Sequence, residues 1–208
     1  MLHVVLGLAN GKVIEVDTRA MTAVDFIPWD SRIGITLLAR FECILTLLIV
    51  SLRSIRAVRH GAIHSLLEEE LKSFHKVQDV CVHTESNSFV ASFSTSNGSI
   101  HRLYRLHLAD DDKVEAIFVN EYCTSSSQFS YMWRNSLFFF SGGLCSLIFQ
   151  EDQNRLVLHD WEGRREDKFL TGCSKVTLIK MLSTSSTQCR GLVLTEKELI
   201  SITLSLSN

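Results

Sequence analysis

Residues 4–19, VVLGLANGKVIEVDTR, contain the strongest local structural signal in the chain. Two apolar-rich runs, Val4–Leu8 and Lys12–Val16, flank the dipeptide Asn10-Gly11. Asn and Gly both tolerate the positive φ angles of a two-residue type I′ turn. The pattern therefore predicts a β-hairpin at the start of the chain, with Asp17 directly after its second strand.

The composition is typical of a folded protein with a substantial core. The chain has 208 residues, of which 46% are hydrophobic and 21% are charged, and it contains one Pro. These values argue against disorder. The formal net charge of −2 implies no bulk electrostatic attraction to nucleic acid or acidic lipid. We expect no direct nucleic-acid partner, although a local basic patch remains compatible with this charge.

The six cysteines lack the spacing of a metal site. Zinc sites are usually built from ligand pairs a few residues apart, and no CxxC pair is present. No secretory signal opens the sequence, so reduced, intracellular and mostly buried thiols are expected. We expect neither a metal nor a cofactor. The cysteines are Cys43, Cys81, Cys123, Cys145, Cys173 and Cys189.

One long apolar stretch, Ile33–Leu52, resembles a membrane span at first sight. Arg40 and Glu42 interrupt it, and the remaining charge-free run, Cys43–Leu52, has ten residues. A span needs about 20. The stretch is therefore interpreted as a buried strand or short core helix, and no membrane association is expected. Basic residues resembling a stop-transfer flank follow it directly: Arg53, Arg56 and Arg59.

The segment His60–Val77 allows two interpretations. Its apolar residues fall close to helical spacing, with Glu68–Glu70 largely on the opposite face, which favours an amphipathic helix near residues 62–76. As part of a β-sheet protein it would instead form two short strands that turn near Leu67–Glu69. The local pattern does not separate these alternatives.

The β signal is steady from Val77 onward. Alternating runs are separated by turn residues at Asn97-Gly98, Asp110–Asp112 and Gly142-Gly143. The predicted strands are Val77–His83, Phe89–Ser94, Ile100–Leu108, Val114–Tyr122, Leu137–Phe140, Leu144–Gln150, Arg155–Asp160, Lys168–Leu170, Lys175–Leu182, Gly191–Leu194 and Leu199–Leu204.

The turns recur at an interval typical of propeller blades. Gly11 and Gly98 are 87 positions apart, about two repeats of 40–45 residues. An apolar residue before Asp, as at Val16-Asp17, resembles the end of the third strand in WD repeats. The fold class predicted is all-β, a partial WD40-like β-propeller of about three to four blades over residues 1–208. Residues 20–60 are expected to be an irregular insertion or a poorly matching blade.

Closed propellers have 4–8 blades, so this count favours a fragment or truncated product. The flanking strands of an open array carry unpaired backbone groups, which can pair with another chain. We therefore expect self-association if the propeller is truncated.

No residues assemble a recognisable reaction centre. Cys81 and His83 share one face of a predicted strand, and a Cys–His nucleophile pair is a minor alternative to two packing residues. The acidic triplets Glu68–Glu70 and Asp110–Asp112 lack the alternating ligand spacing of a calcium loop. They are interpreted as solvated surface.

The strand Ile100–Leu108 is basic and aromatic. Alternation predicts that His101, Arg105 and His107 share one face and that Arg102 and Tyr104 share the other. A partner-facing or phosphate-facing edge is one interpretation of these residues, and ordinary exposure is the other.

Several segments together resemble one known family. They are LGLANGKVIEVDTR at 6–19, CVHTESNSFVASFSTSNGSIHRLYRL at 81–106, a third strand at Leu156–Asp160 and GLVLTEKELI at 191–200. In their order they are similar to the C-terminal blades of the nuclear RING-finger and WD-repeat E3 ubiquitin ligase that acts at stalled replication forks. The apolar stretch Ile33–Leu52 departs from the family pattern.

The resemblance implies a role but no catalysis in this chain. Family members carry a zinc-binding RING and a coiled coil, and neither is present in these residues. The resemblance thus implies the substrate-recruiting WD-repeat part, which in the family contacts replication protein A during the DNA damage response in the nucleus. The alternative is a generic WD-repeat scaffold subunit of another intracellular complex. A hydrolase using Cys81 and His83 is a third class.

Overall fold

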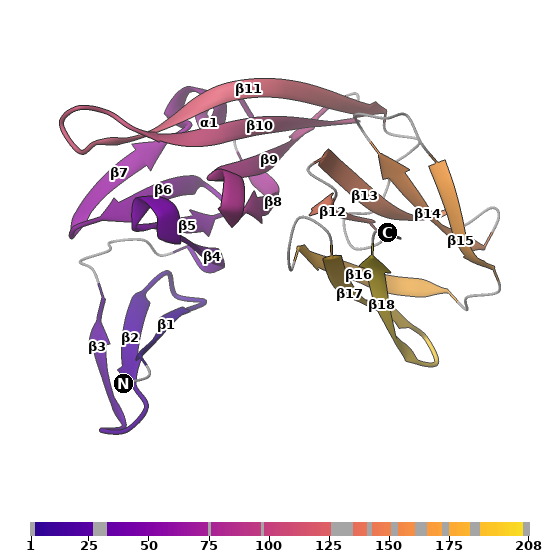
Figure 1. Cartoon of the computed structure of the whole chain (residues 1–208), viewed down its shortest axis with the longest axis horizontal. Coiled ribbons are helices and arrows are strands. Elements are labelled where there is room, and N and C mark those ends of the chain that lie inside the picture. The colour runs from indigo at the N-terminus through magenta and orange to yellow at the C-terminus, as the bar shows by residue number, and fades with distance from the viewer. Residues whose placement is uncertain are drawn as a thin grey trace. The chain divides into compact units, whose positions relative to one another are not determined.

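The computed structural model describes residues 3–26, 33–74, 76–96, 98–125, 135–140, 143–150, 154–160, 166–171, 175–183 and 188–205. Within these residues the chain forms five antiparallel sheets, each a meander in which consecutive strands are neighbours (Figure 1). The sequence predicts about three to four blades, fewer than these five sheets. The difference arises because the apolar stretch at 33–52 is itself the first hairpin of a four-stranded sheet.

The strands follow one another in chain order within every sheet. The sheets comprise β1 (His3–Gly7), β2 (Val13–Asp17) and β3 (Thr22–Asp25); β4 (Ile35–Phe41), β5 (Thr46–Ser51), β6 (Ser54–Arg59) and β7 (Ala62–Leu66); β8 (Val77–His83), β9 (Ser88–Thr95), β10 (Gly98–Leu108) and β11 (Val114–Ser125); β12 (Asn135–Phe140), β13 (Gly143–Gln150), β14 (Arg155–Asp160) and β15 (Glu166–Thr171); and β16 (Val176–Ser183), β17 (Gln188–Thr195) and β18 (Leu199–Ser205). The helical segments are α1 (Glu68–Phe74) and the 3₁₀ turns η1 (Glu42–Ile44) and η2 (Thr84–Ser86).

The chain divides into two compact units. The first holds the sheets β1–β3 and β4–β7, α1 and most of β8–β11, and the second holds the sheets β12–β15 and β16–β18 together with the ends of β8, β10 and β11. The first unit is Met1–Val80, Ser86–Ser96 and Ile100–Glu121, and the second is Cys81–Glu85, Asn97–Ser99 and Tyr122–Asn208.

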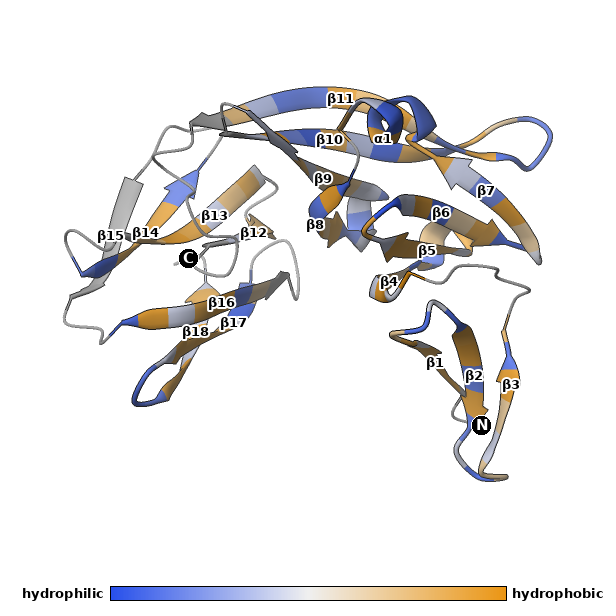
Figure 2. Cartoon of the chain, turned by 180° about the vertical axis from the view of Figure 1, so that it is seen from behind, coloured by the Kyte–Doolittle hydropathy of each residue, from blue (hydrophilic) through white to orange (hydrophobic). Residues whose placement is uncertain are grey.

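The core of the first unit explains the long apolar stretch. Residues of β4 and β5 pair as a hairpin, and β5 is buried along nearly its whole length. Its residues are mostly apolar, as the hydrophobic colour of β5 in Figure 2 shows. Ile49 of β5 clusters with Val58 of β6 and with Val13 of β2 from the neighbouring sheet. Of the two alternatives predicted for this stretch, a buried strand and a short core helix, the structure has the buried strand. No helix in the described part of the chain is both long and apolar enough to cross a bilayer.

The second unit has its own core between its two sheets. Phe138 and Leu147 of the first sheet pack with Ile179, Met181 and Val193 of the second. The buried Ser136 hydroxyl accepts a hydrogen bond from the Met181 backbone N–H at 2.9 Å. This hydrogen bond favours one relative position of the two sheets, because a shift that left the buried hydroxyl unpaired would cost free energy.

The N-terminal hairpin forms where the sequence predicts it, but its turn differs. Gly7 pairs with Val13, so the loop holds five residues instead of two. The Gly11 N–H donates to the Leu8 carbonyl at 3.0 Å, and Gly11 has φ +87° while Asn10 remains outside the positive-φ region. A two-residue turn with positive φ at both positions occurs instead at His60-Gly61, between β6 and β7.

Asp17 ends β2 by capping the turn that follows. Its Oδ1 accepts the backbone N–H of Arg19 at 2.8 Å and of Ala20 at 3.1 Å. The carboxylate thus satisfies donors that the turn leaves without strand partners. This is a physical reason for an Asp at the exit of this strand.

One loop geometry occurs in two successive sheets. The β4–β5 loop ends at Leu45 with φ +47°, and the β8–β9 loop ends at Asn87 with φ +51°, 42 positions later. The next residue in each case returns its hydroxyl to the backbone: Thr46 to the Ile44 carbonyl at 2.9 Å and Ser88 to the Ser86 carbonyl at 3.1 Å. The interval agrees with the predicted blade repeat.

The segment from His60 to Val77 forms one strand followed by one short helix, so it matches neither predicted alternative in full. β7 ends at Leu66, Leu67 adopts φ +56°, and α1 begins at Glu68. The Leu71 N–H donates to the Leu67 carbonyl at 3.0 Å. The helix is shorter than its periodicity indicates, because the first half of the segment pairs with β6.

The predicted strands after Val77 are confirmed: each falls on one of the strands β8 to β18. The turn at Asp110–Asp112 joins β10 and β11 as predicted. Asn97, Gly142, Trp161 and Cys173 lie outside the described residues.

Candidate interaction site

Helix α1 is anchored to the sheet β8–β11. The Phe74 ring at its last position stacks on Phe93 of β9, with centroids 4.9 Å apart and planes at 24°. The guanidinium of Arg102 from β10 lies 5.1 Å from the Phe74 ring centroid. Stacking and cation–π contacts of this kind hold one end of a short helix that would be marginal alone.

A polar contact holds the middle of α1. The Tyr104 hydroxyl donates to Glu70 Oε1 at 3.0 Å, and Arg102 Nη1 lies 3.8 Å from the same oxygen. Arg102 Nε also contacts Glu121 of β11 at 2.7 Å. Burial, followed by the nearby Glu70 carboxylate, raises the pKa of Tyr104 well above its usual range, so the phenol stays protonated and keeps its role as donor.

A groove of about 600 Å³ lies along α1 and the β6–β7 hairpin. Its apolar lining comes from Ile55, Leu66 and Leu71, of which Ile55 and Leu66 pair across the hairpin and are nearly inaccessible. Its charged lining is mainly basic. The charged residues are Arg53, Arg56, Lys72 and Glu68.

The local backbone explains where the two arginines lie. Arg53 is in the tight turn between β5 and β6, where the buried Ser51 hydroxyl accepts the Ser54 N–H at 3.1 Å. Arg56 is two residues into β6 and pairs with Ser65 of β7. The turn and the strand register therefore carry both side chains to the border of the groove.

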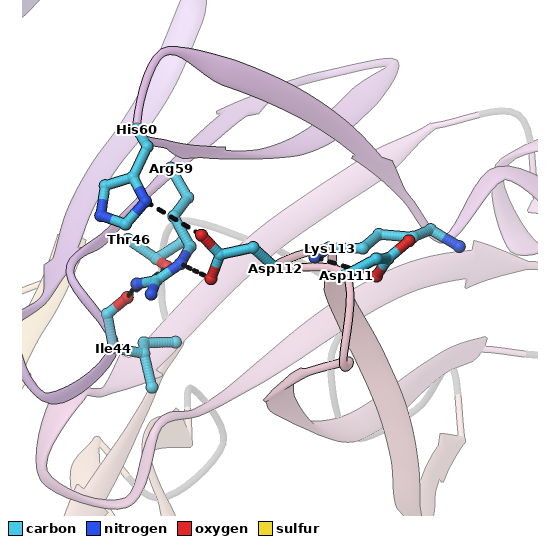
Figure 3. A network of polar contacts seen from close by, with 7 residues as sticks. All are labelled: Ile44, Thr46, Arg59, His60, Asp111, Asp112 and Lys113. Carbon is cyan, nitrogen blue, oxygen red and sulfur yellow. Dashed lines mark hydrogen bonds and ion pairs between the residues drawn. The ribbon is translucent and has the colours of Figure 1, made fainter.

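A second polar cluster, here called the clasp, connects three loops of the first unit (Figure 3). Arg59 Nε contacts Asp112 Oδ1 at 3.0 Å, and His60 Nδ1 contacts Asp112 Oδ2 at 3.1 Å. Arg59 Nη1 also donates to the Ile44 carbonyl, which accepts the Thr46 hydroxyl as well. The hydrogen bonds from Arg59, and then from His60, hold the pKa of the Asp112 carboxyl below its usual value.

The two acidic triplets thus have protein partners. Glu70 accepts from Tyr104, Glu69 pairs with Lys72 at 2.6 Å, and Asp112 belongs to the clasp. Asp111 accepts the Lys113 backbone N–H at 3.2 Å. In the ranges the structure describes, no group of three or more His, Cys, Asp or Glu residues is arranged to hold a metal ion.

The basic strand β10 does not present a single face. His101 is 3% exposed and its Nδ1 lies 2.8 Å from the Ser92 hydroxyl. Burial lowers the pKa of His101 to about 4, so the ring is neutral at physiological pH. Arg102 and Tyr104 lie beneath α1, and Arg105 and His107 are exposed. Alternation alone predicts His101 beside Arg105; it misses the change in burial along the strand.

Cys81 and His83 have packing roles in the second unit. Cys81 is partly buried against the core of that unit. The His83 ring stacks on Phe139 with centroids 4.9 Å apart, and its Nε2 lies 3.8 Å from Glu85 Oε2. Of the cysteines in the described ranges, Cys145 and Cys189 are buried, whereas Cys43 and Cys123 are exposed.

The groove is the feature that sequence reasoning misses. Arg53, Arg56 and Arg59 attract attention only as a flank of the apolar stretch, yet two of them line the groove and the third holds the clasp. A signal was present: a basic cluster and an amphipathic segment lie within twenty residues of each other. Local patterns do not show that the two meet.

Comparisons with known proteins identify similar folds but no protein of similar sequence. No family model and no curated protein matches the sequence of this chain. Among solved structures, TolB from Acinetobacter baumannii aligns with a TM-score of 0.57 and 9% identity, over 99% of this chain and 52% of that one. The chain thus spans about half the length of TolB.

Two further structures are similar over nearly the whole chain. A chain of a nidogen/laminin complex aligns with a TM-score of 0.56 and 10% identity, over 96% of this chain and 77% of that one. The β-propeller domain of Cps50 (Swd1) from Myceliophteria thermophila aligns with a TM-score of 0.51 and 14% identity, over 98% of this chain and 68% of that one. Together with the five sheets, these likenesses confirm an all-β, partial propeller-like fold.

Proposed function

We propose that this chain is a protein-interaction module of the β-propeller type. The observation that carries the proposal is the groove along α1, whose lining combines apolar and charged side chains in the mixture typical of protein interfaces. The helix that borders it is fastened to the neighbouring sheet, so the surface is preformed. Propeller folds commonly present such surfaces on a rigid scaffold.

More specifically, we propose the substrate-recruiting part of a RING-finger and WD-repeat E3 ubiquitin ligase, acting in the nucleus in the response to replication stress. Support comes from the order of sequence features: the GLANG hairpin, the third strand at Leu156–Asp160 and the LTEK hairpin. These features lie on β1–β2, β14 and β17–β18 respectively. Under this proposal the chain binds replication protein A and leaves ubiquitin transfer to the RING.

A binding assay with purified components tests the ligase proposal. The full chain, immobilised at one end, is expected to retain recombinant replication protein A above the level retained by an unrelated propeller. Retention equal to that control would remove the ligase proposal. The full-length transcript gives a second check, because the proposal requires a RING reading frame upstream.

The second candidate is a scaffold subunit of another complex. The similar chain from the nidogen/laminin complex favours it, since that structure is of a propeller-like chain in an assembly of two proteins. In this case the chain binds a partner other than replication protein A, and no RING reading frame accompanies it.

A further inference from the structure

We propose that the groove along β6, β7 and α1 binds an acidic segment of a partner protein that also carries apolar side chains. The inference rests on the proposed interaction function and names the chemistry of its partner. It concerns one site, lined by residues of the first unit alone.

The charge of the groove is opposite to that of the chain. The chain carries a formal net charge of −2, whereas the groove is lined by three basic side chains and one carboxylate. Arg53 is exposed, and its guanidinium makes no ion pair with any other residue in the described ranges. An arginine of this kind is available for a carboxylate, which it can bind through two parallel hydrogen bonds.

The remaining lining favours a polypeptide over a nucleic acid. The half-buried Leu71 offers an apolar contact for a side chain such as Leu or Phe, whereas Ile55 and Leu66 in the same lining are nearly inaccessible. Glu68 on the border repels a continuous run of phosphates, whereas a peptide can place an uncharged residue opposite it. The exposed Ser65 hydroxyl adds a donor for a backbone carbonyl.

The groove is also held in place by contacts outside its lining. Ser51 fixes the turn that carries Arg53. The Phe74–Phe93 stack and the Tyr104–Glu70 hydrogen bond fix α1 from the opposite side. A preformed site loses less conformational entropy when it binds an extended segment, so weak individual contacts suffice for measurable affinity.

The probe is a short fluorescein-labelled peptide in which Asp and Glu alternate with Leu, titrated with the full chain by fluorescence anisotropy. The double variant Arg53→Glu/Arg56→Glu is expected to weaken binding by about tenfold or more, because it reverses two of the cations that face the peptide. The affinity of the unaltered chain is expected to fall as salt is raised. Unchanged affinity in the double variant would overturn the inference.

The matched control is Arg19→Glu/Arg105→Glu, which makes the same change in net charge at exposed positions outside the groove. Its affinity for the peptide should equal that of the unaltered chain. A loss as large as that of the groove variant would overturn the inference, because net charge alone would then explain the binding. Thermal melts of both variants establish that each remains folded.

Two further probes test the chemistry of the occupant. A peptide with Leu replaced by Ser should bind more weakly, and the variant Leu71→Ser should remove that difference. A single-stranded oligonucleotide of equal charge should bind less tightly than the peptide. An oligonucleotide that binds more tightly, or a peptide indifferent to the loss of Leu, would overturn the inference.

The experiments distinguish a failure of the groove inference from a failure of the proposed function. If replication protein A or another purified partner binds the Arg53→Glu/Arg56→Glu variant as well as the unaltered chain, the groove inference falls and the interaction function stands. If the acidic peptide binds the groove while replication protein A is not retained, the ligase proposal falls and the groove inference stands.

Discussion

Two turns of the first unit have the same backbone but different sequences. In the β1–β2 turn, LANGK at 8–12, the Leu8 N–H donates to the Lys12 carbonyl, and the Gly11 N–H donates to the Leu8 carbonyl. In the β10–β11 turn, ADDDK at 109–113, Ala109, Asp112 and Lys113 repeat this arrangement at 2.9 and 3.0 Å. The fourth residue has positive φ in both turns: +87° at Gly11 and +65° at Asp112.

The difference shows how one position can serve conformation in one place and contact in another. Glycine adopts positive φ without steric cost, whereas Asp, which tolerates the left-handed region better than most L-residues, still has a modest cost there. Asp112 nevertheless brings a carboxylate to Arg59 and His60. A glycine, the residue at the equivalent position of the β1–β2 turn, has no side chain to make these contacts. The clasp therefore depends on an Asp at a turn position whose positive φ favours glycine.

The largest expected effect comes from removing Arg59, which contacts Asp112 in the β10–β11 turn. Arg59→Ala leaves the Ile44 carbonyl and the Asp112 carboxylate without a partly buried cation, so we expect a loss of about 2 kcal/mol in the free energy of unfolding. Urea denaturation measures it. Arg59→Met keeps the aliphatic stem and should lose less. A negligible loss in Arg59→Met beside a full loss in Arg59→Ala would show that packing, and not the clasp, accounts for the effect.

A smaller effect is expected in the other turn. Gly11→Ala places a Cβ at φ +87°, which should destabilise the chain by about 1 kcal/mol. The control is Ala9→Gly, in the same loop but at a residue without positive φ. A drop in melting temperature confined to Gly11→Ala is expected, and equal melting temperatures for Gly11→Ala and the unaltered chain would contradict the turn assignment.

Exchanging the residue at Asp112 sharpens the comparison. Asp112→Gly relieves the positive φ but removes the contacts with Arg59 and His60, so the two effects oppose each other and the net change should be smaller than at Gly11. Asp112→Ala loses the contacts and keeps the strain, and should therefore be less stable than Asp112→Gly. Melting temperatures in the reverse order would refute this account of the turn.

The smallest effect is a pH dependence. Because the pKa of Asp112 is lowered in the folded chain, its contribution is present above the unfolded value of 3.8 and is lost as pH falls through the folded value. The stability difference between the unaltered chain and Asp112→Asn should shrink below about pH 3.8.

Comparing the two proteins at each pH removes a shared background. Burial lowers the pKa of His101 from 6.5 to about 4, so both proteins lose stability as pH falls between these values. Urea midpoints measured in pairs isolate Asp112. A difference that stays constant from pH 6 to pH 3 would contradict the assigned role of its charge.

Short-range patterns predict much of this fold, because the alternation of apolar and polar residues that indicates a strand can be recognised within a few residues. β8 and β14 coincide with their predicted ranges, and the hairpin at 4–19 is placed correctly. The turn inside that hairpin is not, because Asn-Gly is compatible with more than one loop length and the pairing of Gly7 with Val13 selects among them. Likewise, periodicity alone predicts a helix near residues 62–76. The structure has a shorter helix, α1, because residues 62–66 form β7 and pair with β6.

By itself, the sequence determined an all-β chain with blade-like spacing, because alternation and turn residues act over distances of a few positions. Only the tertiary structure decided which side chains meet. Arg59 and Asp112 are 53 positions apart, and the groove unites the β5–β6 turn with a helix that follows two strands later. Such contacts arise from the packing of one sheet on the next, and no local pattern encodes them.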